Sequence, residues 1–403
     1  MSKTIIIIGA GLAGLSAALQ AAENGCNVKL VSSLPSERAQ SVMAEGGINA
    51  ALNTKDENDS PEEHFTDTIK AACGLADPNA VWGMTQAAPE LVHWLLKLGV
   101  KFNMSGYDDV DLRNFGGQKK KRTAFAQSDT GKQIMTAMID AVRRKEASGM
   151  VERFSHHSFL TLRLCGNICC GCVIRDEYSQ ETVELPGDAV IVATGGMHGL
   201  FGNTTGSLSN TGEVTAELFR LGVPLANGEM IQYHPTTVKC GGKRMLISEA
   251  ARGEGGRLFA MKDGKQWYFM EEKYPELGNL MPRDITAREI WKVSHESEVF
   301  LDMTEISEEI ISNKLSGLAD DCMTYLHKDI RKEPVSVLPG IHYFMGGILV
   351  DEQHRTPIQN LYAAGECCAQ YHGANRLGGN SLLGALYGGR VAAKSACEQA
   401  DVV

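Results

Sequence analysis

The sequence has no excess of positive charge and little that could cross a membrane. Its 49 acidic residues outnumber the 39 lysines and arginines, and the formal net charge is −10. An acidic balance argues against nucleic acid as a partner. The short basic run 119–122 is predicted to be a solvated loop and not a nucleic-acid patch. The apolar stretch 4–22 contains three glycines and is better explained as a buried strand that turns into a helix. Because no other apolar run is long enough to span a bilayer, we expect no membrane span, no secretory leader and a cytoplasmic protein.

The cysteines lack the spacing of a zinc site. All eleven are scattered along the chain, and the odd number excludes a complete disulfide framework. The densest group surrounds a Gly-Asn pair, but the repeated Cys-x-x-Cys spacing is missing from it (Cys165, Cys169, Cys170 and Cys172). We therefore predict a β-hairpin with reduced thiols at this place and no metal site.

What the sequence does have is a dinucleotide signature at its start. Residues 4–31 have the pattern of a strand, a helix and a second strand. Gly9, Gly11 and Gly14 lie at the first junction, where they suit a tight turn, backbone contact with a pyrophosphate, and close packing of helix on strand. The acidic residue expected at the end of the second strand is replaced by Ser32, whose hydroxyl would bond a ribose more weakly.

Further segments of the chain fit a long cofactor. Gly-rich turns follow predicted strands at 193–196 and 364–366, and residues 40–52 form a small-residue loop suited to lying against a ligand. Two later returns to the same cofactor suit FAD better than NAD. The pattern also predicts two helices over 61–100, a helix over 131–147, strands over 151–192 and a last helix over 381–400.

The second half of the chain contains several residues that can carry positive charge. Two histidines and three arginines occur in polar motifs (His234, Arg252, Arg283, His342 and Arg376). Arginine binds carboxylates through two parallel hydrogen bonds. We therefore predict that His234 and the hydroxyl of Ser248 hold one carboxylate of a small dicarboxylate, and that His342 and Arg376 hold the other.

At this point the motifs resemble those of a known family. Ser41-Val-Met-Ala-Glu-Gly-Gly-Ile, Phe115-Gly-Gly, Arg122-Thr-Ala-Phe-Ala and Gln232-Tyr-His-Pro-Thr are similar to segments of the flavoprotein subunit of succinate dehydrogenase and fumarate reductase. The superfamily also includes L-aspartate oxidase, and the resemblance runs from about residue 3 to residue 397. It implies an α/β fold, in which a Rossmann-like FAD-binding domain (1–227 and 342–403) is interrupted by a smaller α+β capping domain (228–341).

The resemblance also implies roles for individual residues. It makes Arg283 the proton donor, resupplied by Arg252 and Glu249, and it adds Phe115 to the substrate site. The residues that it places at the FAD, besides the three glycines and Ser32, are Gln40, Ser41, Gly46, Gly47, Thr194, Gly195, Glu213, Glu366, Ser381 and Leu382.

The sequence departs from the family pattern in three places. Members of membrane complexes attach FAD through a histidine where this chain has Gln40, so we expect FAD to be bound non-covalently and the reaction to favour reduction. Glu213 follows Thr-Gly where the family has Gly-Asp-Gly. The respiratory subunits continue into a helical C-terminal domain beyond the position of Val403, which leaves docking to an iron–sulfur subunit open.

The resulting hypothesis is FAD-dependent reduction of fumarate, or a close unsaturated dicarboxylate, to succinate. Hydride would come from flavin N5 and the proton from Arg283, and the reverse reaction would be succinate oxidation. One alternative is L-aspartate oxidase, against which the cations of 118–122 argue, because they are ill suited to an ammonium group. Another is an electron-transfer subunit of a larger complex, in the cytoplasm or at the periphery of a membrane. The electron donor is open, an iron–sulfur protein being one option.

Overall fold

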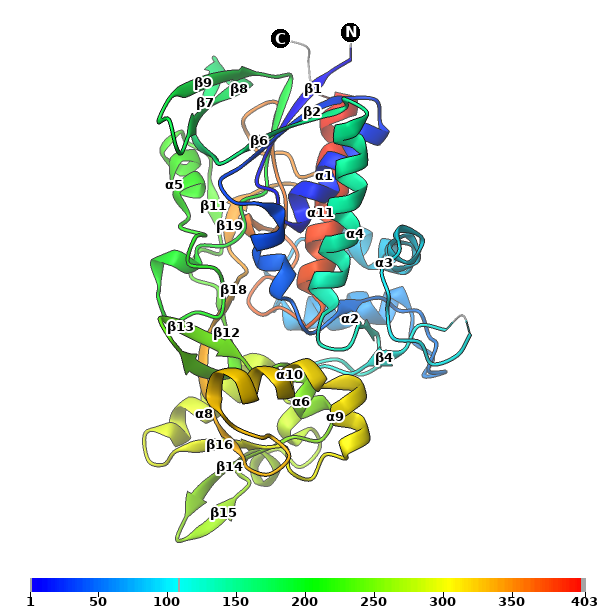
Figure 1. Cartoon of the computed structure of the whole chain (residues 1–403), viewed down its shortest axis with the longest axis vertical. Coiled ribbons are helices and arrows are strands. Elements are labelled where there is room, and N and C mark those ends of the chain that lie inside the picture. Colours follow the sequence, from blue (N-terminus) through cyan, green and yellow to red (C-terminus); the bar gives the residue numbers. More distant parts are fainter. Residues whose placement is uncertain (1, 108, 400–403) are drawn as a thin grey trace.

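A parallel sheet at the centre of the molecule carries the first predicted motif. The computed structural model describes residues 2–107 and 109–399 (Figure 1). Five parallel strands follow the order β20 (Leu361–Ala363), β10 (Ala189–Val192), β1 (Thr4–Ile8), β2 (Asn27–Ser32) and β6 (Val151–Ser155). Side chains of β1 are buried on both faces, which explains its unbroken β-branched sequence. The α/β class is thereby confirmed.

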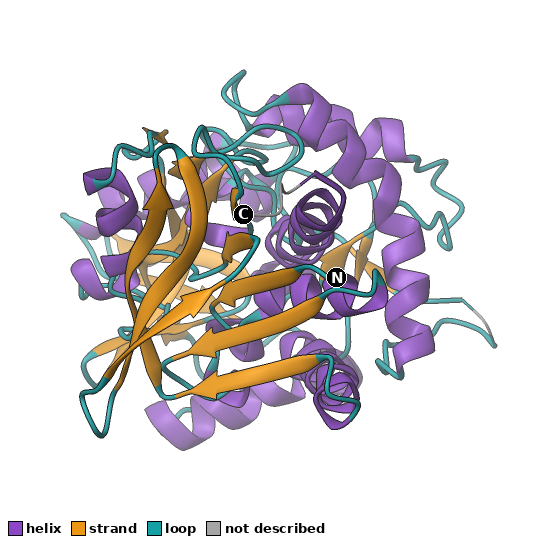
Figure 2. Ribbon diagram, turned by 90° about the horizontal axis from the view of Figure 1, so that it is seen from above, coloured by secondary structure: helices purple, strands orange, loops and turns teal. Residues whose placement is uncertain are grey.

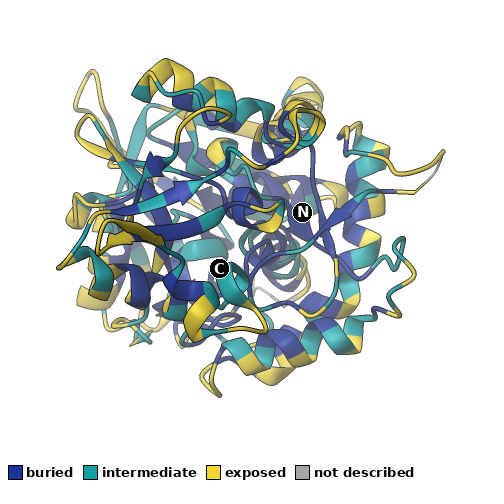
Figure 3. Cartoon of the chain, turned by 90° about the horizontal axis from the view of Figure 1, so that it is seen from below, coloured by how far each residue is buried: buried dark blue, intermediate teal, exposed yellow. Residues whose placement is uncertain are grey.

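The two faces of this sheet are covered differently. Ile5 and Ile7 pack with α1 (Leu12–Glu23), α4 (Thr130–Ala147) and α11 (Asn380–Gln399). Ile6 and Ile8 pack against an antiparallel sheet of β7 (His157–Cys165), β8 (Ile168–Asp176) and β9 (Thr182–Pro186). Figure 2 views this layered arrangement from above, and Figure 3 shows that buried residues run through the interior while exposed residues lie on peripheral helices and loops.

A second unit of mixed structure forms the lower part of Figure 1. It contains a sheet of β13 (Lys243–Leu246), β12 (Ile231–Cys240) and β18 (Leu338–Phe344), and a sheet of β15 (Lys265–Trp267), β14 (Arg257–Lys262), β16 (Val299–Asp302) and β17 (Val335–Ser336). Its helices are α6 (Glu249–Gly253), α7 (Phe269–Lys273), α8 (Arg283–Ser294), α9 (Glu308–Lys314) and α10 (Ser316–Asp321). Its apolar cluster is separate from those on the parallel sheet and draws Phe115 from outside the segment. The exact limits of the capping domain stay a prediction, and the proposed boundary between 341 and 342 falls within β18.

Further helices and short sheets complete the fold. They are helices α2 (Pro61–Ala71), α3 (Pro78–Leu98) and α5 (Glu213–Arg220), the sheet β3 (Ile48–Asn49), β5 (Thr123–Ala124) and β4 (Leu112–Arg113), and the sheet β11 (Leu225–Ala226), β19 (Gly347–Leu349) and β21 (Cys368–Ala369). The predicted helices, and the hairpin turn at Gly166-Asn167, are confirmed within a residue or two.

The prediction that 119–122 is a solvated loop is wrong for its last residue. The Arg122 side chain is 0% exposed and lies 2.8 Å from Asp59 Oδ1 and 3.0 Å from Asp67 Oδ2. Lys120 Nζ donates to the backbone oxygen of Glu57, and Lys121 forms an ion pair with the Glu57 carboxylate. A run of cations looks solvated in sequence, since its acidic partners come from a loop about 60 residues earlier in the chain.

Replacement of Arg122 by alanine should therefore destabilise the fold strongly. Removing one partner leaves two carboxylates buried without compensation, which typically lowers the free energy of unfolding by about 3–5 kcal/mol. Arg143→Ala is the matched control, because the Arg143–Glu37 ion pair is about half exposed and such pairs contribute at most about 1 kcal/mol. Urea denaturation of both variants measures the difference, and equal losses would contradict the assignment.

Candidate active site between the parallel sheet and the cap

A cavity of about 800 Å³ opens at the carboxyl ends of β1, β2 and β10 and extends beneath the second unit. Ligands bind at this edge of parallel sheets in α/β folds. Every predicted site residue except Gly14 and Arg252 lines it. The cavity thus brings together residues from Gly9 to Leu382, whereas the individual roles predicted for them stay predictions.

The glycines of the first turn divide into two kinds. A Cβ on Gly9 would lie 2.2 Å from Ala193 O, and a Cβ on Gly14 would lie 1.9 Å from Gly9 O, so close packing within the protein explains both. A Cβ on Gly11 would meet nothing nearer than 3.8 Å. The packing of the protein therefore does not require a glycine at position 11, but a ligand approaching the backbone would.

Polar groups around this turn are placed to meet a dinucleotide. Gly11 precedes the first turn of α1 and has no side chain to cap it, and the Leu12 N–H donates to Ser41 Oγ at 3.3 Å, so the remaining N–H groups of this turn lie at the edge of the cavity. The Ser32 hydroxyl is buried and has no hydrogen-bond partner in the described structure. Glu366 Oε1 accepts a hydrogen bond from the backbone N–H of Phe344 and lies 3.1 Å from His198 Nε2, which fixes this carboxylate at the cavity wall. An unpartnered hydroxyl, an open glycine and a helix start at the cavity fit the ribose and pyrophosphate of FAD.

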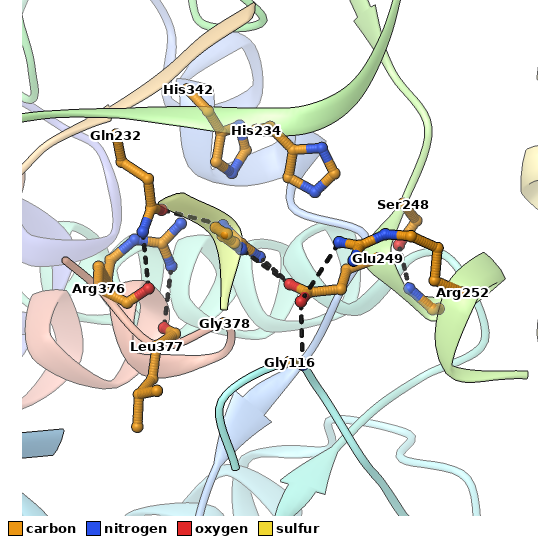
Figure 4. A network of polar contacts seen from close by, with 12 residues as sticks. Gly116, Gln232, His234, Ser248, Glu249, Arg252, His342, Arg376, Leu377 and Gly378 are labelled. Atoms are coloured by element: carbon orange, nitrogen blue, oxygen red, sulfur yellow. Dashed lines mark hydrogen bonds and ion pairs between the residues drawn. The ribbon is translucent and has the colours of Figure 1, made fainter. Parts of the chain in front are cut away.

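A chain of charged groups lies at the other end of the cavity (Figure 4). Arg283, the first residue of α8, donates from Nε and Nη2 to Glu249 Oε2 at 2.8 and 2.6 Å. The opposite oxygen of Glu249 accepts the Gly116 N–H and lies 3.5 Å from Arg252 Nη2. Burial would raise the pKa of Glu249, but Arg283, Arg252 and these hydrogen bonds hold it below its usual value. Glu249 is therefore a carboxylate anion between two guanidiniums.

Two histidines face the same space from neighbouring strands. The rings of His234 on β12 and His342 on β18 have centroids 5.1 Å apart. Burial, reinforced by the charge of Arg283, lowers the pKa of both imidazoles well below the ordinary value, so both are neutral near pH 7. Thr205 Oγ1 lies 2.7 Å from Nδ1 of His342 and orients that ring.

Arg376 completes the cationic side of the cavity. Its guanidinium is stacked 4.3 Å from the centre of the Tyr343 ring, and Nε is buried without a hydrogen-bond partner in the described structure. Burial, and then the charge of Arg283, lowers the pKa of Arg376 to about 9. Three guanidiniums gather here, and Glu249 contacts Arg283 and Arg252 but not Arg376. Such a site favours an anionic ligand.

Close approach of the backbone keeps this end of the cavity compact. A Cβ on Gly378 would lie 2.7 Å from Phe115 Cδ2, 2.9 Å from Glu249 Oε2 and 3.0 Å from Arg283 Nη2. The Ser248 hydroxyl caps α6 by accepting the Ala250 N–H at 3.4 Å, which holds the helix that carries Glu249 and Arg252. Arg252 lies behind Glu249 with a side chain that is 0% exposed.

Two residues at the site were not predicted to act there. Gln232 accepts from Arg283 Nη1 at 3.0 Å and donates to the backbone oxygen of Arg376 at 2.7 Å, so one amide holds both arginines. Thr205 orients His342. Gln232 lies two residues before His234 on the same strand, so its position in that motif could have identified it from the sequence. The residues around Thr205 gave no such indication.

The basic residues of 118–122 do not line the cavity. Neither Gln118 nor any of the four basic residues lines it, and Lys121 and Arg122 form ion pairs with Glu57, Asp59 and Asp67 instead. The argument drawn from them against a cationic amine substrate is therefore wrong.

Within residues 2–107 and 109–399, no group of three or more His, Cys, Asp or Glu side chains is placed to hold a metal ion. In the same part of the chain, no helix combines the length and apolarity that a membrane crossing requires.

The fold and the cavity define an FAD-dependent oxidoreductase. Residues 4–382 match the family described as FAD binding domain. The chain is 44% identical to the succinate dehydrogenase flavoprotein subunit of Bacillus subtilis over 98% of its own length and 69% of that protein. It is 34% identical to the fumarate reductase flavoprotein subunit of Haemophilus influenzae, over 98% and 68%. A solved structure of a mutant E. coli quinol fumarate reductase chain superposes with a TM-score of 0.92 at 31% identity, covering 99% of this chain and 70% of that one.

The chain therefore belongs to the family of succinate dehydrogenase and fumarate reductase flavoprotein subunits. The predicted family, the FAD cofactor, and the FAD-binding α/β domain with its cap are confirmed.

The distinction between the glycines can be tested on the apoprotein. Gly11→Ala should leave the melting temperature of the apoprotein unchanged, because its Cβ meets no protein atom closer than 3.8 Å, but should weaken FAD binding at least about 10-fold by obstructing the pyrophosphate. Gly14→Ala is the control, since its Cβ would collide with Gly9 O and lower the melting temperature without FAD. FAD titration and thermal unfolding measure the two effects. Unchanged FAD affinity in Gly11→Ala would refute the placement.

Proposed function

We propose that this chain reduces fumarate, or a closely related unsaturated dicarboxylate, to the saturated acid, and that it oxidises the saturated acid in the reverse direction. The observation that carries the proposal is the gathering of Arg283, Arg376 and His234, all buried, and the half-buried His342 in the cavity that begins at the FAD turn. Cationic and imidazole groups enclosed in this way suit a small dianion, and the names of the relatives, succinate dehydrogenase and fumarate reductase, agree with it.

The two ends of the substrate would meet different groups. His234 and Ser248 lie toward α6 and would hold one carboxylate, whereas His342 and Arg376 would hold the other. Neutral imidazoles donate hydrogen bonds without adding charge, so the arginines supply the electrostatic attraction. Fixing both ends would set the double bond in one orientation and remove much of the entropic cost of the reaction. Residues 228–341 would act as the cap that excludes water.

Arg283 is the group we assign to proton transfer. Its Nε and Nη2 are bound to Glu249, while Nη1 reaches Gln232 and lies on the cavity side of the ion pair. A proton given up by Arg283 would be replaced through Glu249 from Arg252, the order in which the three groups contact one another.

FAD, once bound, supplies the hydride from its N5. The residues that would hold it are Gly9 and Gly11, Ser32 at the ribose, the 40–47 loop and the start of α11. Gln40 lines the cavity where covalent members of the family have a histidine, and an amide forms no histidyl link. We therefore infer non-covalent attachment. Several relatives are named as subunits, which supports a partner protein, such as an iron–sulfur protein, as electron donor.

Fumarate turnover should depend on Arg283. Purified protein loaded with FAD is reduced anaerobically with a chemical donor, and its reoxidation by fumarate is followed by flavin absorbance. Arg283→Ala should lower the rate by roughly 10³-fold while FAD stays bound, because the proton donor is lost. Arg288→Ala is the matched control, an exposed arginine on the same helix, and should keep full activity.

The same assay separates the competing functions. Peroxide formation that depends on aspartate would identify an aspartate oxidase, like the relative of that name from Streptomyces coelicolor, which is 34% identical over 98% of this chain and 68% of its own length. Absence of turnover with any enoate would indicate an electron-transfer subunit. Fumarate activity that survives in Arg283→Ala would contradict the proposed proton donor.

The mode of FAD attachment has its own test. Acid precipitation of the holoprotein should release the yellow colour into the supernatant, because no histidine stands at position 40. The Gln40→His variant, treated in the same way, shows whether a linkage can form when the imidazole is supplied. Flavin that stays with the pellet of the unchanged protein would overturn the inference.

A further inference from the structure

A second cavity, remote from the substrate clamp, lies where α1, α3 and α11 meet. It measures about 750 Å³, and its lining includes Asn24, Trp94, Tyr387, Arg390, Lys394 and Cys397. None of its lining residues belongs to the first cavity. The cavity gives small molecules from solvent a route to the sulfur of Cys397, which the reaction proposed above does not use.

A second thiol lies directly behind this one. The sulfur atoms of Cys26 and Cys397 are 2.8 Å apart, although 371 residues separate them along the chain. Cys26 is 5% exposed and follows the end of α1, whereas Cys397 is partly exposed near the end of α11. Sulfurs at this separation need to move by less than about 1 Å to reach the ~2.05 Å of a disulfide bond.

We propose that Cys26 and Cys397 are a modification site, at which a peroxide that enters the second cavity converts the two thiols into a reversible disulfide. The Cys397 sulfur would attack hydrogen peroxide, break the O–O bond, and become a sulfenic acid with release of one water. The Cys26 sulfur then displaces the hydroxyl, which leaves as a second water with the remaining proton. Two thiols are oxidised by two electrons and one peroxide is reduced to two waters.

Burial of the thiols slows this reaction but does not prevent it. Desolvation, and then the hydrogen bond with Cys26, raises the pKa of Cys397, so little thiolate is present near pH 7. Lys3 works in the other direction, because its ammonium group binds the backbone oxygen of Cys397 at 2.8 Å. The link should therefore form more slowly than oxidation of the exposed thiol of Cys73.

The position of the pair gives the cross-link a consequence for the cofactor. Helices α1 and α11 lie side by side, and the N-terminal residues of both, Leu12 and Ser381 among them, line the FAD cavity. Cys26 and Cys397 join the opposite ends of the same helices. A covalent link there opposes the separation of α1 from α11, which unfolding of this part of the FAD cavity requires.

The test uses the complete FAD-loaded protein and hydrogen peroxide. After treatment, free thiols are alkylated and the protein is digested without reductant. We expect a linked peptide pair that contains Cys26 and Cys397, which disappears on treatment with dithiothreitol. The melting temperature should rise by about 3 °C, and release of FAD should slow several-fold. Cys397→Ser, a partly exposed position outside the active site, should lose all three effects and keep its basal turnover.

Other cysteines of the chain serve as internal controls for this test. Loss of alkylation at Cys73 shows that the oxidant has acted, and the neighbouring Cys165 and Cys170, with sulfurs 3.0 Å apart, provide a second pair for comparison. If Cys26 and Cys397 stay alkylated after Cys73 has reacted, the proposal is overturned. It is overturned equally if either thiol is recovered in sulfinic form or bound to a second molecule.

Discussion

Glu249 holds two buried guanidinium groups together at the place where the two units of the molecule meet. A buried arginine without a partner is costly, and removal of such a carboxylate leaves an uncompensated charge. Its contacts explain several features at once: the start of α8 lies against α6, the Gly116 N–H is directed inward, and Gly378 has no room for a side chain. Among the residues that the structure describes, no carboxylate forms an ion pair with Arg376, and this remaining positive charge suits the cavity to a dianion.

The other end of the cavity depends on backbone geometry more than on charge. The helix start at Gly11, the buried hydroxyl of Ser32 and the anchored carboxylate of Glu366 each present one polar group to a cofactor. Between the two ends the cavity is continuous, so a flavin bound at the sheet would extend toward the imidazoles of His234 and His342. Segments before residue 228 and after residue 341 thus line the sheet end of the cavity, and His234, Arg283, His342 and Arg376 line its other end.

The sequence predicted the structure correctly where contacts are made between near neighbours or within one helix or strand. The strand, turn and helix of residues 4–23 follow from a β-branched run, glycines and helical spacing, and the structure has them as predicted. The gathering of Arg283, His234, His342 and Arg376 was predicted through family motifs, since no periodicity connects residues so far apart. The prediction of a solvated loop at 119–122 was wrong for Arg122, because its ion pairs with Asp59 and Asp67 are buried.

The sequence by itself determined the parallel sheet with its glycine turn, because burial on both faces and close helix packing leave few residue types that fit. Tertiary structure alone decided which long-range pairs form. Gln232 meets Arg283 across 51 residues, and Cys26 meets Cys397 across 371. Such contacts depend on how whole helices and sheets are packed, and a pattern read over a dozen residues contains no information about that packing.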